Sequence, residues 1–123
     1  MKFNIKLRNE IERYRNYIII VEGKKDVDAL KAFGFQNVHA IHQNSVPLRE
    51  RVEQIMAFVG RKDRVCILTD FDRRGKILYE KIKPIFQELG AHLDSSFRGI
   101  LLKARISHIE GISGFMEKVE NAQ

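Results

Sequence analysis

The chain has 123 residues, 44% hydrophobic and 31% charged, with only two prolines and eight glycines. This length and composition predict one compact domain with a core of its own, and they exclude disordered and fibrous proteins. The net charge of +6 favours a polyanionic partner such as nucleic acid, although some basic proteins bind none.

Three features predict a protein of the reducing cytoplasm. The longest apolar run, from Tyr17 to Val21, has five residues, against the roughly 20 that a membrane-spanning helix needs. The first residues lack the apolar stretch and cleavage site of a signal peptide. The single cysteine, Cys66, can form neither an internal disulfide nor a zinc cage, and its apolar neighbours predict a core position.

Helical and strand patterns alternate along the chain. Leu7, Ile11 and Tyr14 have helical spacing and predict an N-terminal helix over residues 1–14. Short β-branched or apolar runs predict strands at 17–21, 37–41, 64–69, 91–93 and 98–102. Apolar stripes predict helices at 24–33, 48–59 and 78–89, the first closed by Gly34 and the last kinked or restarted at Pro84.

A final helix is predicted over residues 107–120. Ser107 and Glu110 have the spacing of a capping box, which competes with a functional role for His108 and Glu110. No repeat or linker interrupts the pattern, so residues 1–123 are predicted to form a single domain. Strands that alternate with helices predict an α/β fold with a parallel sheet.

Two acidic turns each follow an apolar strand. They read Glu22-Gly23-Lys24-Lys25-Asp26 and Asp70-Phe71-Asp72-Arg73-Arg74-Gly75-Lys76. Ligands bind beyond the carboxyl ends of parallel strands, so neighbouring strands would bring Glu22, Asp70 and Asp72 together, with Phe71 turned to the core. Such carboxylates repel one another unless a hard divalent cation lies between them. Mg²⁺ fits best, and the sequence does not distinguish it from Mn²⁺.

Basic residues open the two helices that follow these turns. They are Lys24, Lys25, Arg73, Arg74 and Lys76. Because helix N-termini also attract anions, this arrangement suits a phosphodiester bridged by a metal ion. A simpler interpretation stays open, in which Glu22-Gly23 forms an ordinary turn and the two aspartates cap the next helix.

The two turns, in this order, resemble the motifs of the Toprim family over roughly residues 16–103. The chain is most similar to small stand-alone Toprim proteins of archaea and bacteria, a family that also includes domains of primases and of the ribonuclease that matures 5S ribosomal RNA. The resemblance implies a Rossmann-like three-layer sandwich with a central, mainly parallel sheet. The chain departs from the family in the loop after the second strand, which usually carries a small residue or glycine and here reads His42-Gln43-Asn44-Ser45-Val46-Pro47.

The resemblance also implies roles for single residues. Glu22 would act as general acid or base and Asp70 and Asp72 would bind Mg²⁺, while Gly23, Asp26 and Gly75 would shape the turns. The predicted function is metal-dependent phosphodiester cleavage of the ribonuclease type, as in rRNA processing, with RNA favoured over DNA. Two alternatives stay open: a non-catalytic or partner-dependent nucleic-acid adaptor and, more remotely, a receiver-like signalling domain.

Overall fold

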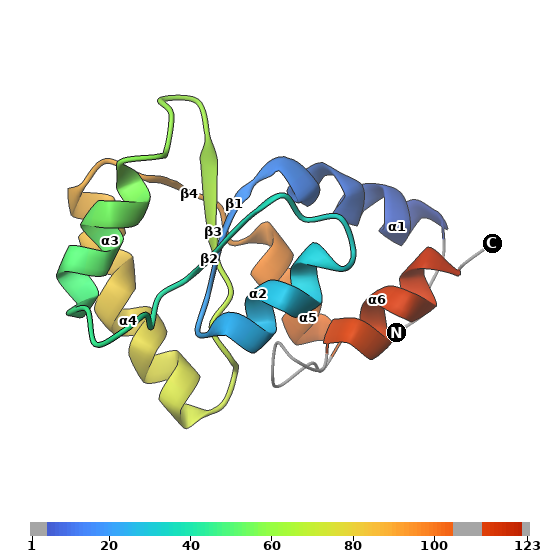
Figure 1. Cartoon of the computed structure of the whole chain (residues 1–123). Helices are drawn as coiled ribbons and strands as arrows, with labels where there is room; N and C mark the ends of the chain where they lie inside the picture. Colours follow the sequence, from blue (N-terminus) through green and yellow to red (C-terminus); the bar gives the residue numbers. More distant parts are fainter. Residues whose placement is uncertain (1–4, 105–111, 122–123) are drawn as a thin grey trace.

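Four parallel strands form one central sheet in the computed structural model, which describes residues 5–104 and 112–121 (Figure 1). The strands are β1 (Ile18–Val21), β2 (Asn37–Ala40), β3 (Arg64–Ile67) and β4 (His92–Leu93). Their order, β2-β1-β3-β4, puts β1 and β3 at the centre. All of β1 and the last three residues of β3 are buried, as expected for strands covered on both faces.

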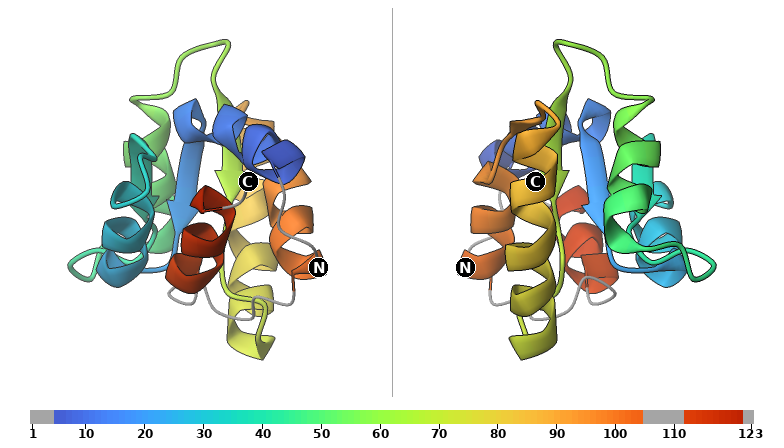
Figure 2. Two further views of the ribbon diagram at one scale, coloured as in Figure 1. Left: turned by 90° about the vertical axis from the view of Figure 1, so that its right-hand side faces the viewer. Right: turned by 90° about the vertical axis from the view of Figure 1, so that its left-hand side faces the viewer.

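Helices cover both faces of the sheet. They are α1 (Ile5–Glu12) with the 3₁₀ helix η1 (Arg13–Asn16), α2 (Lys24–Lys31), α3 (Leu48–Met56), α4 (Arg73–Glu88), α5 (Ser96–Lys103) and α6 (Ile112–Glu120). Figure 2 shows α1, α5 and α6 over one face and α3 and α4 over the other. Side chains of β1 alternate between two core clusters, with Ile19 packed toward α2 and α5 and Ile20 toward α3 and α4. The predicted three-layer α/β sandwich is therefore confirmed.

The predicted elements are present up to β4, although the helix predicted at 78–89 begins five residues earlier, at Arg73. The strand expected at 98–102 is wrong, because this segment belongs to α5. Helix α4 continues through Pro84 and does not restart there. Gly34 follows α2 with a φ of 88°, as expected for a residue that ends a helix. The proposed cap at Ser107, and with it His108 and Glu110, lies outside the described residues.

The described helices are all too short or too polar to cross a membrane.

Candidate functional site

The acidic turns meet at the point where the strand order reverses. The chain passes from β1 outward to β2 and from β3 outward to β4, in opposite directions, so β1 and β3 flank a crevice at their carboxyl ends. Leu68 N donates to Ile20 O at 2.7 Å and extends the pairing beyond β3. The carboxyl ends of β1 and β3, which Glu22 and Asp70 follow closely, therefore lie at the same end of the sheet, and both strands point downward in Figure 1. Open α/β sheets bind ligands at this place.

Glu22 and Asp70 interact directly. Burial of the Glu22 carboxyl, a hydrogen bond with the Asp70 side chain and the negative charges of Asp70, Asp72 and Asp26 together raise the pKa of Glu22 to about 7. The raised pKa shows that simultaneous ionisation of these crowded carboxyl groups is unfavourable. A proton or a bound cation would relieve this repulsion.

A hollow of about 390 Å³ opens above this pair. Its lining residues are Glu22, Gly23, Lys24, Lys25, Asp26, His42, Asp70, Asp72 and Arg74. The structure thus gathers the three carboxylates and three of the five basic residues predicted for the site. Arg73 and Lys76 lie elsewhere, since they line a separate hollow on α4 together with Ile77.

Gly75 has a steric reason to be glycine. A Cβ atom at this position would lie 2.0 Å from the carbonyl oxygen of Asp70, so only glycine lets the first turn of α4 approach the acidic turn this closely. Asp72 precedes α4 and caps it, since its Oδ1 accepts a hydrogen bond from Gly75 N at 2.8 Å. One oxygen of Asp72 is therefore engaged in the fold.

The first acidic turn is built differently. Asp26 Oδ2 accepts a hydrogen bond from Gly23 N at 3.2 Å and joins the start of α2 to the end of β1. A Cβ atom at Gly23 would meet no other group within 4 Å, and the backbone there is extended. Gly23 therefore leaves open space on the rim of the hollow beside Glu22.

Arg98 is a contributor that the sequence analysis missed. From α5, its Nη1 donates to Thr69 O at 2.9 Å and to Thr69 Oγ1 at 3.3 Å. Its guanidinium lies between two aromatic rings, 4.4 Å from the centroid of Phe71 and 4.2 Å from that of Tyr79. Burial lowers the pKa of Arg98, while the negative charges of Asp70 and Glu22 act in the other direction. Arg98 thus stabilises the start of the second acidic turn through its hydrogen bonds to Thr69.

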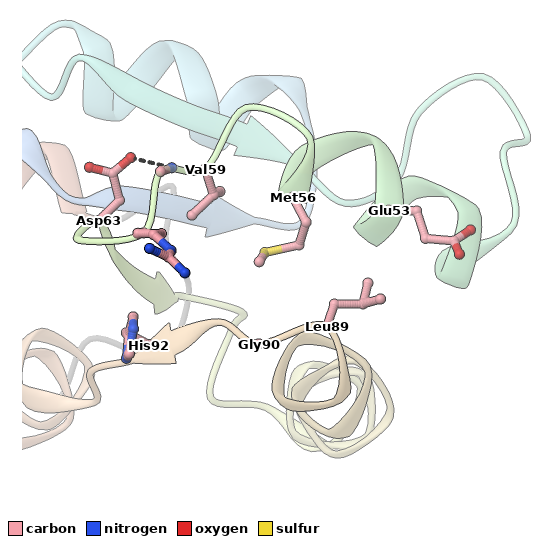
Figure 3. A pocket seen from close by; sticks show the side chains of 9 residues that line it. Glu53, Met56, Val59, Asp63, Leu89, Gly90 and His92 are labelled. Atoms are coloured by element: carbon pink, nitrogen blue, oxygen red, sulfur yellow. Dashed lines mark hydrogen bonds between the residues drawn. The ribbon is translucent and has the colours of Figure 1, made fainter.

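Another cavity, of about 470 Å³, lies at the amino ends of β3 and β4, away from the acidic turns (Figure 3). Figure 3 shows its two carboxylates, Glu53 and Asp63, on opposite sides of the cavity. Asp63 Oδ2 accepts a hydrogen bond from Gly60 N at 2.7 Å. This cavity therefore lacks the paired carboxylates of the hollow between β1 and β3.

Comparison with known proteins agrees with this geometry, because residues 17–100 match the Toprim domain. The chain belongs to the Toprim family. A UPF0292 protein of Methanosarcina barkeri is 32% identical over 120 residues, covering 92% of this chain and 80% of the relative. A UPF0292 protein of Methanocaldococcus jannaschii is 31% identical over 103 residues, or 81% of this chain and 78% of the relative.

Two further matches extend the comparison. The DNA primase DnaG of Aeropyrum pernix is 31% identical over 67 residues, which cover 54% of this chain and 15% of the primase. A solved structure of a protein from Aquifex aeolicus has a TM-score of 0.71 and 29% identity, covering 86% of this chain and 94% of the other. Membership in the Toprim family implies a metal-binding function associated with nucleic acid.

The acidic residues fit a partly open Mg²⁺ site. Within residues 5–104 and 112–121, no three carboxylate, imidazole or thiolate groups stand close enough to form a complete metal cage. Mg²⁺ is commonly held by one or two carboxylates, with water and substrate phosphate completing its octahedron. Glu22, Asp70 and Asp72 line one hollow and would offer carboxylate oxygens of that kind.

Proposed function

We propose that this Toprim protein is a Mg²⁺-dependent enzyme that cleaves phosphodiester bonds in nucleic acid. The observation that carries the proposal is the hollow that Glu22, Asp70 and Asp72 line together with the cationic side chains of Lys24, Lys25 and Arg74. Carboxylates beside a metal ion suit phosphoryl chemistry, and the lysines and arginine suit a polyanionic substrate.

The residues divide into three roles. Asp70 and Asp72 would hold Mg²⁺ together with one oxygen of Glu22, and the bound ion would stabilise negative charge on the phosphate. Glu22 is the proton-transfer group, as the resemblance to the Toprim family implies, and its half-buried carboxyl lies in the same hollow as the two aspartates. Lys24, Lys25 and Arg74 line the same hollow and contact phosphate oxygens.

RNA is the first substrate to test. The motifs resemble those of the ribonuclease that matures 5S ribosomal RNA. This resemblance favours structured RNA as the substrate and a role in rRNA processing. The match to a DNA primase supports nucleic acid as the substrate class without separating RNA from DNA. Each assay therefore includes both polymers.

The test is cleavage of end-labelled structured RNA, including a 5S precursor, and of single-stranded DNA, with Mg²⁺ or with EDTA. We expect cuts at defined positions with Mg²⁺, no cleavage in EDTA, and losses of at least about 100-fold in Glu22→Gln and Asp70→Asn. Glu53→Gln is the matched control, since it removes a carboxylate at the opposite end of the sheet. It should cleave like the wild type.

Binding without cleavage, unaffected by the substitutions at Glu22 and Asp70, would contradict the proposal. That result would favour the adaptor function, in which any chemistry belongs to a partner.

A further inference from the structure

A second hollow, of about 540 Å³, adjoins the acidic one across the edge strand β2. It is lined by residues of α2, β2, the loop after β2 and α3, and it shares Lys24 and His42 with the acidic hollow. His42 N donates to Glu22 O at 3.1 Å, so the loop that walls the second hollow is joined to the acidic turn. The two hollows therefore form a continuous surface.

Arg51 is the most informative residue of this second hollow. Its Nε donates to Ala40 O at 2.8 Å and its Nη1 to Gln54 Oε1 at 3.3 Å, both neutral acceptors. Among the ion pairs of the described residues, none joins Arg51 to a carboxylate. Burial lowers the pKa of Arg51 and no nearby charge opposes the shift. A fixed, partly buried guanidinium whose charge is not neutralised is suited to an anionic ligand.

The surrounding charges have the same sign. Lys31 is exposed on α2, and both Lys31 and Arg51 act on the half-buried imidazole of His39, whose pKa is lowered by burial first and by these two charges next. The one carboxylate of the lining, Asp28, already pairs with Lys24 at 3.0 Å. The hollow is therefore positive at neutral pH.

A substrate strand needs such a surface, because the acidic hollow is a poor attractant for a polyanion. Its lining holds four carboxylates, Glu22, Asp26, Asp70 and Asp72, against the three cationic side chains of Lys24, Lys25 and Arg74, so these cations are largely offset by acidic neighbours. Affinity for a nucleic-acid backbone must come largely from cations next to the reacting centre. The hollow beside β2 supplies them.

We infer that the hollow beside β2 binds the phosphodiester backbone of a nucleic-acid strand that passes through the acidic hollow, with Lys31 and Arg51 as its phosphate contacts. The inference rests on the proposed function for its choice of polyanion. His39 and the amide side chains of Gln43 and Asn44 line the same hollow and offer further hydrogen bonds to sugar or phosphate.

The test is fluorescence anisotropy with a fluorescein-labelled 20-nucleotide single-stranded RNA of mixed sequence, and with the DNA of the same sequence. EDTA is present throughout, so that binding is measured without cleavage. The variants are Lys31→Gln, Arg51→Gln, the double variant and Arg51→Lys. Lys31 is exposed on a helix, so its substitution keeps the test valid if Arg51→Gln folds poorly.

We expect the double variant to bind at least about tenfold more weakly and to lose about 1.4 from the slope of log K against log salt, roughly 0.7 for each phosphate contact. Arg51→Lys should retain most of the affinity. Arg61→Gln is the matched control, because it removes one positive charge beside the cavity at the other end of the sheet. It should bind like the wild type.

The outcomes separate the inference from the proposed function. Wild-type affinity and salt slope in the double variant would overturn the inference alone. Weaker binding in the double variant, together with a wild type that binds but never cleaves, would support the inference and overturn the proposed function. A wild type that binds neither RNA nor DNA in EDTA would overturn the inference, and the proposed function would be overturned separately by the absence of cleavage in Mg²⁺.

Discussion

The two acidic turns begin alike and are built differently. Each follows a central strand, presents a carboxylate and opens a helix. The turn between β3 and α4 is tightly packed, because Gly75 touches the Asp70 backbone and Arg98 holds Thr69. The turn between β1 and α2 has open space at Gly23, directly beside Glu22.

This difference in packing between the two turns matches two different requirements of the proposed reaction. In the proposed function, Asp70 and Asp72 are metal ligands, which must be held within fractions of an ångström, and the packed turn suits that role. Glu22 is the proposed proton-transfer group, which needs access to the substrate, and the open space at Gly23 suits that role.

The two glycines should respond in opposite ways to alanine. Gly75→Ala should lower the free energy of unfolding by about 3 kcal/mol or more, because its Cβ would lie 2.0 Å from Asp70 O. Gly23→Ala should change it by less than about 0.5 kcal/mol, since the added Cβ would meet no group within 4 Å. Urea unfolding of both variants measures the contrast. Equal effects would show that the two turns are equally packed.

Arg98→Gln should destabilise the packed turn by about 2 kcal/mol, because it removes the cation between Phe71 and Tyr79 and the hydrogen bonds to Thr69. Arg98→Lys should recover part of this loss. Urea unfolding measures the stability, and metal titration by calorimetry should show weaker Mg²⁺ binding in Arg98→Gln. The control is Lys103→Gln, an exposed change in the same helix. Unchanged Mg²⁺ affinity in Arg98→Gln would rule out a positioning role.

Asp72 allows its capping role to be separated from its charge. Asp72→Ala should cost about 1 kcal/mol of stability, since α4 loses its N-cap, whereas Asp72→Asn should keep the cap and cost less than about 0.5 kcal/mol. Both variants should bind Mg²⁺ more weakly if the charge of Asp72 contributes to the site. Urea unfolding combined with calorimetric metal titration measures both properties. Wild-type metal affinity in Asp72→Asn would limit Asp72 to helix capping.

Glu22 should add a small pH dependence to stability. Its pKa is raised from 4.5 to about 7, so the folded protein binds this proton more tightly than the unfolded chain. The resulting stabilisation is complete below pH 4.5 and is lost as the pH rises through 7. In EDTA, Glu22→Gln should therefore gain stability relative to the wild type between pH 5 and pH 8. Parallel pH profiles of the two proteins would contradict this prediction.

Much of the fold could be predicted because the sequences of β1 and β3 are short apolar runs that are typical of buried strands. Their apolar residues face a core on both sides, so the runs at 17–21 and 64–69 contrast sharply with the helices around them. Since parallel strands end at one edge, the positions of Glu22 and Asp70 directly after these runs were enough to predict their proximity. In the structure both carboxylates line the same hollow.

Helix α5 could not be predicted, because Ile100-Leu101-Leu102 satisfies a strand pattern as well as a helical one. Packing decides the matter: Phe97 and Leu101, one helical turn apart, are fully buried, whereas Leu102 is 57% exposed. The position of Arg98 under the second acidic turn follows from that tertiary packing. Helical geometry also explains why Arg73 and Lys76 do not line the acidic hollow, since they share another face of α4 with Ile77.

The most direct test of the central claim is the location of a bound divalent ion. Mn²⁺ added to ¹⁵N-labelled protein broadens the amide signals of residues near it. We predict that substoichiometric Mn²⁺ first broadens the signals of Glu22, Gly23 and residues 69–73, that excess Mg²⁺ restores them, and that Asp70→Asn abolishes the effect. Broadening centred on Glu53 and Asp63, or none that Mg²⁺ reverses, would contradict a metal centre between β1 and β3.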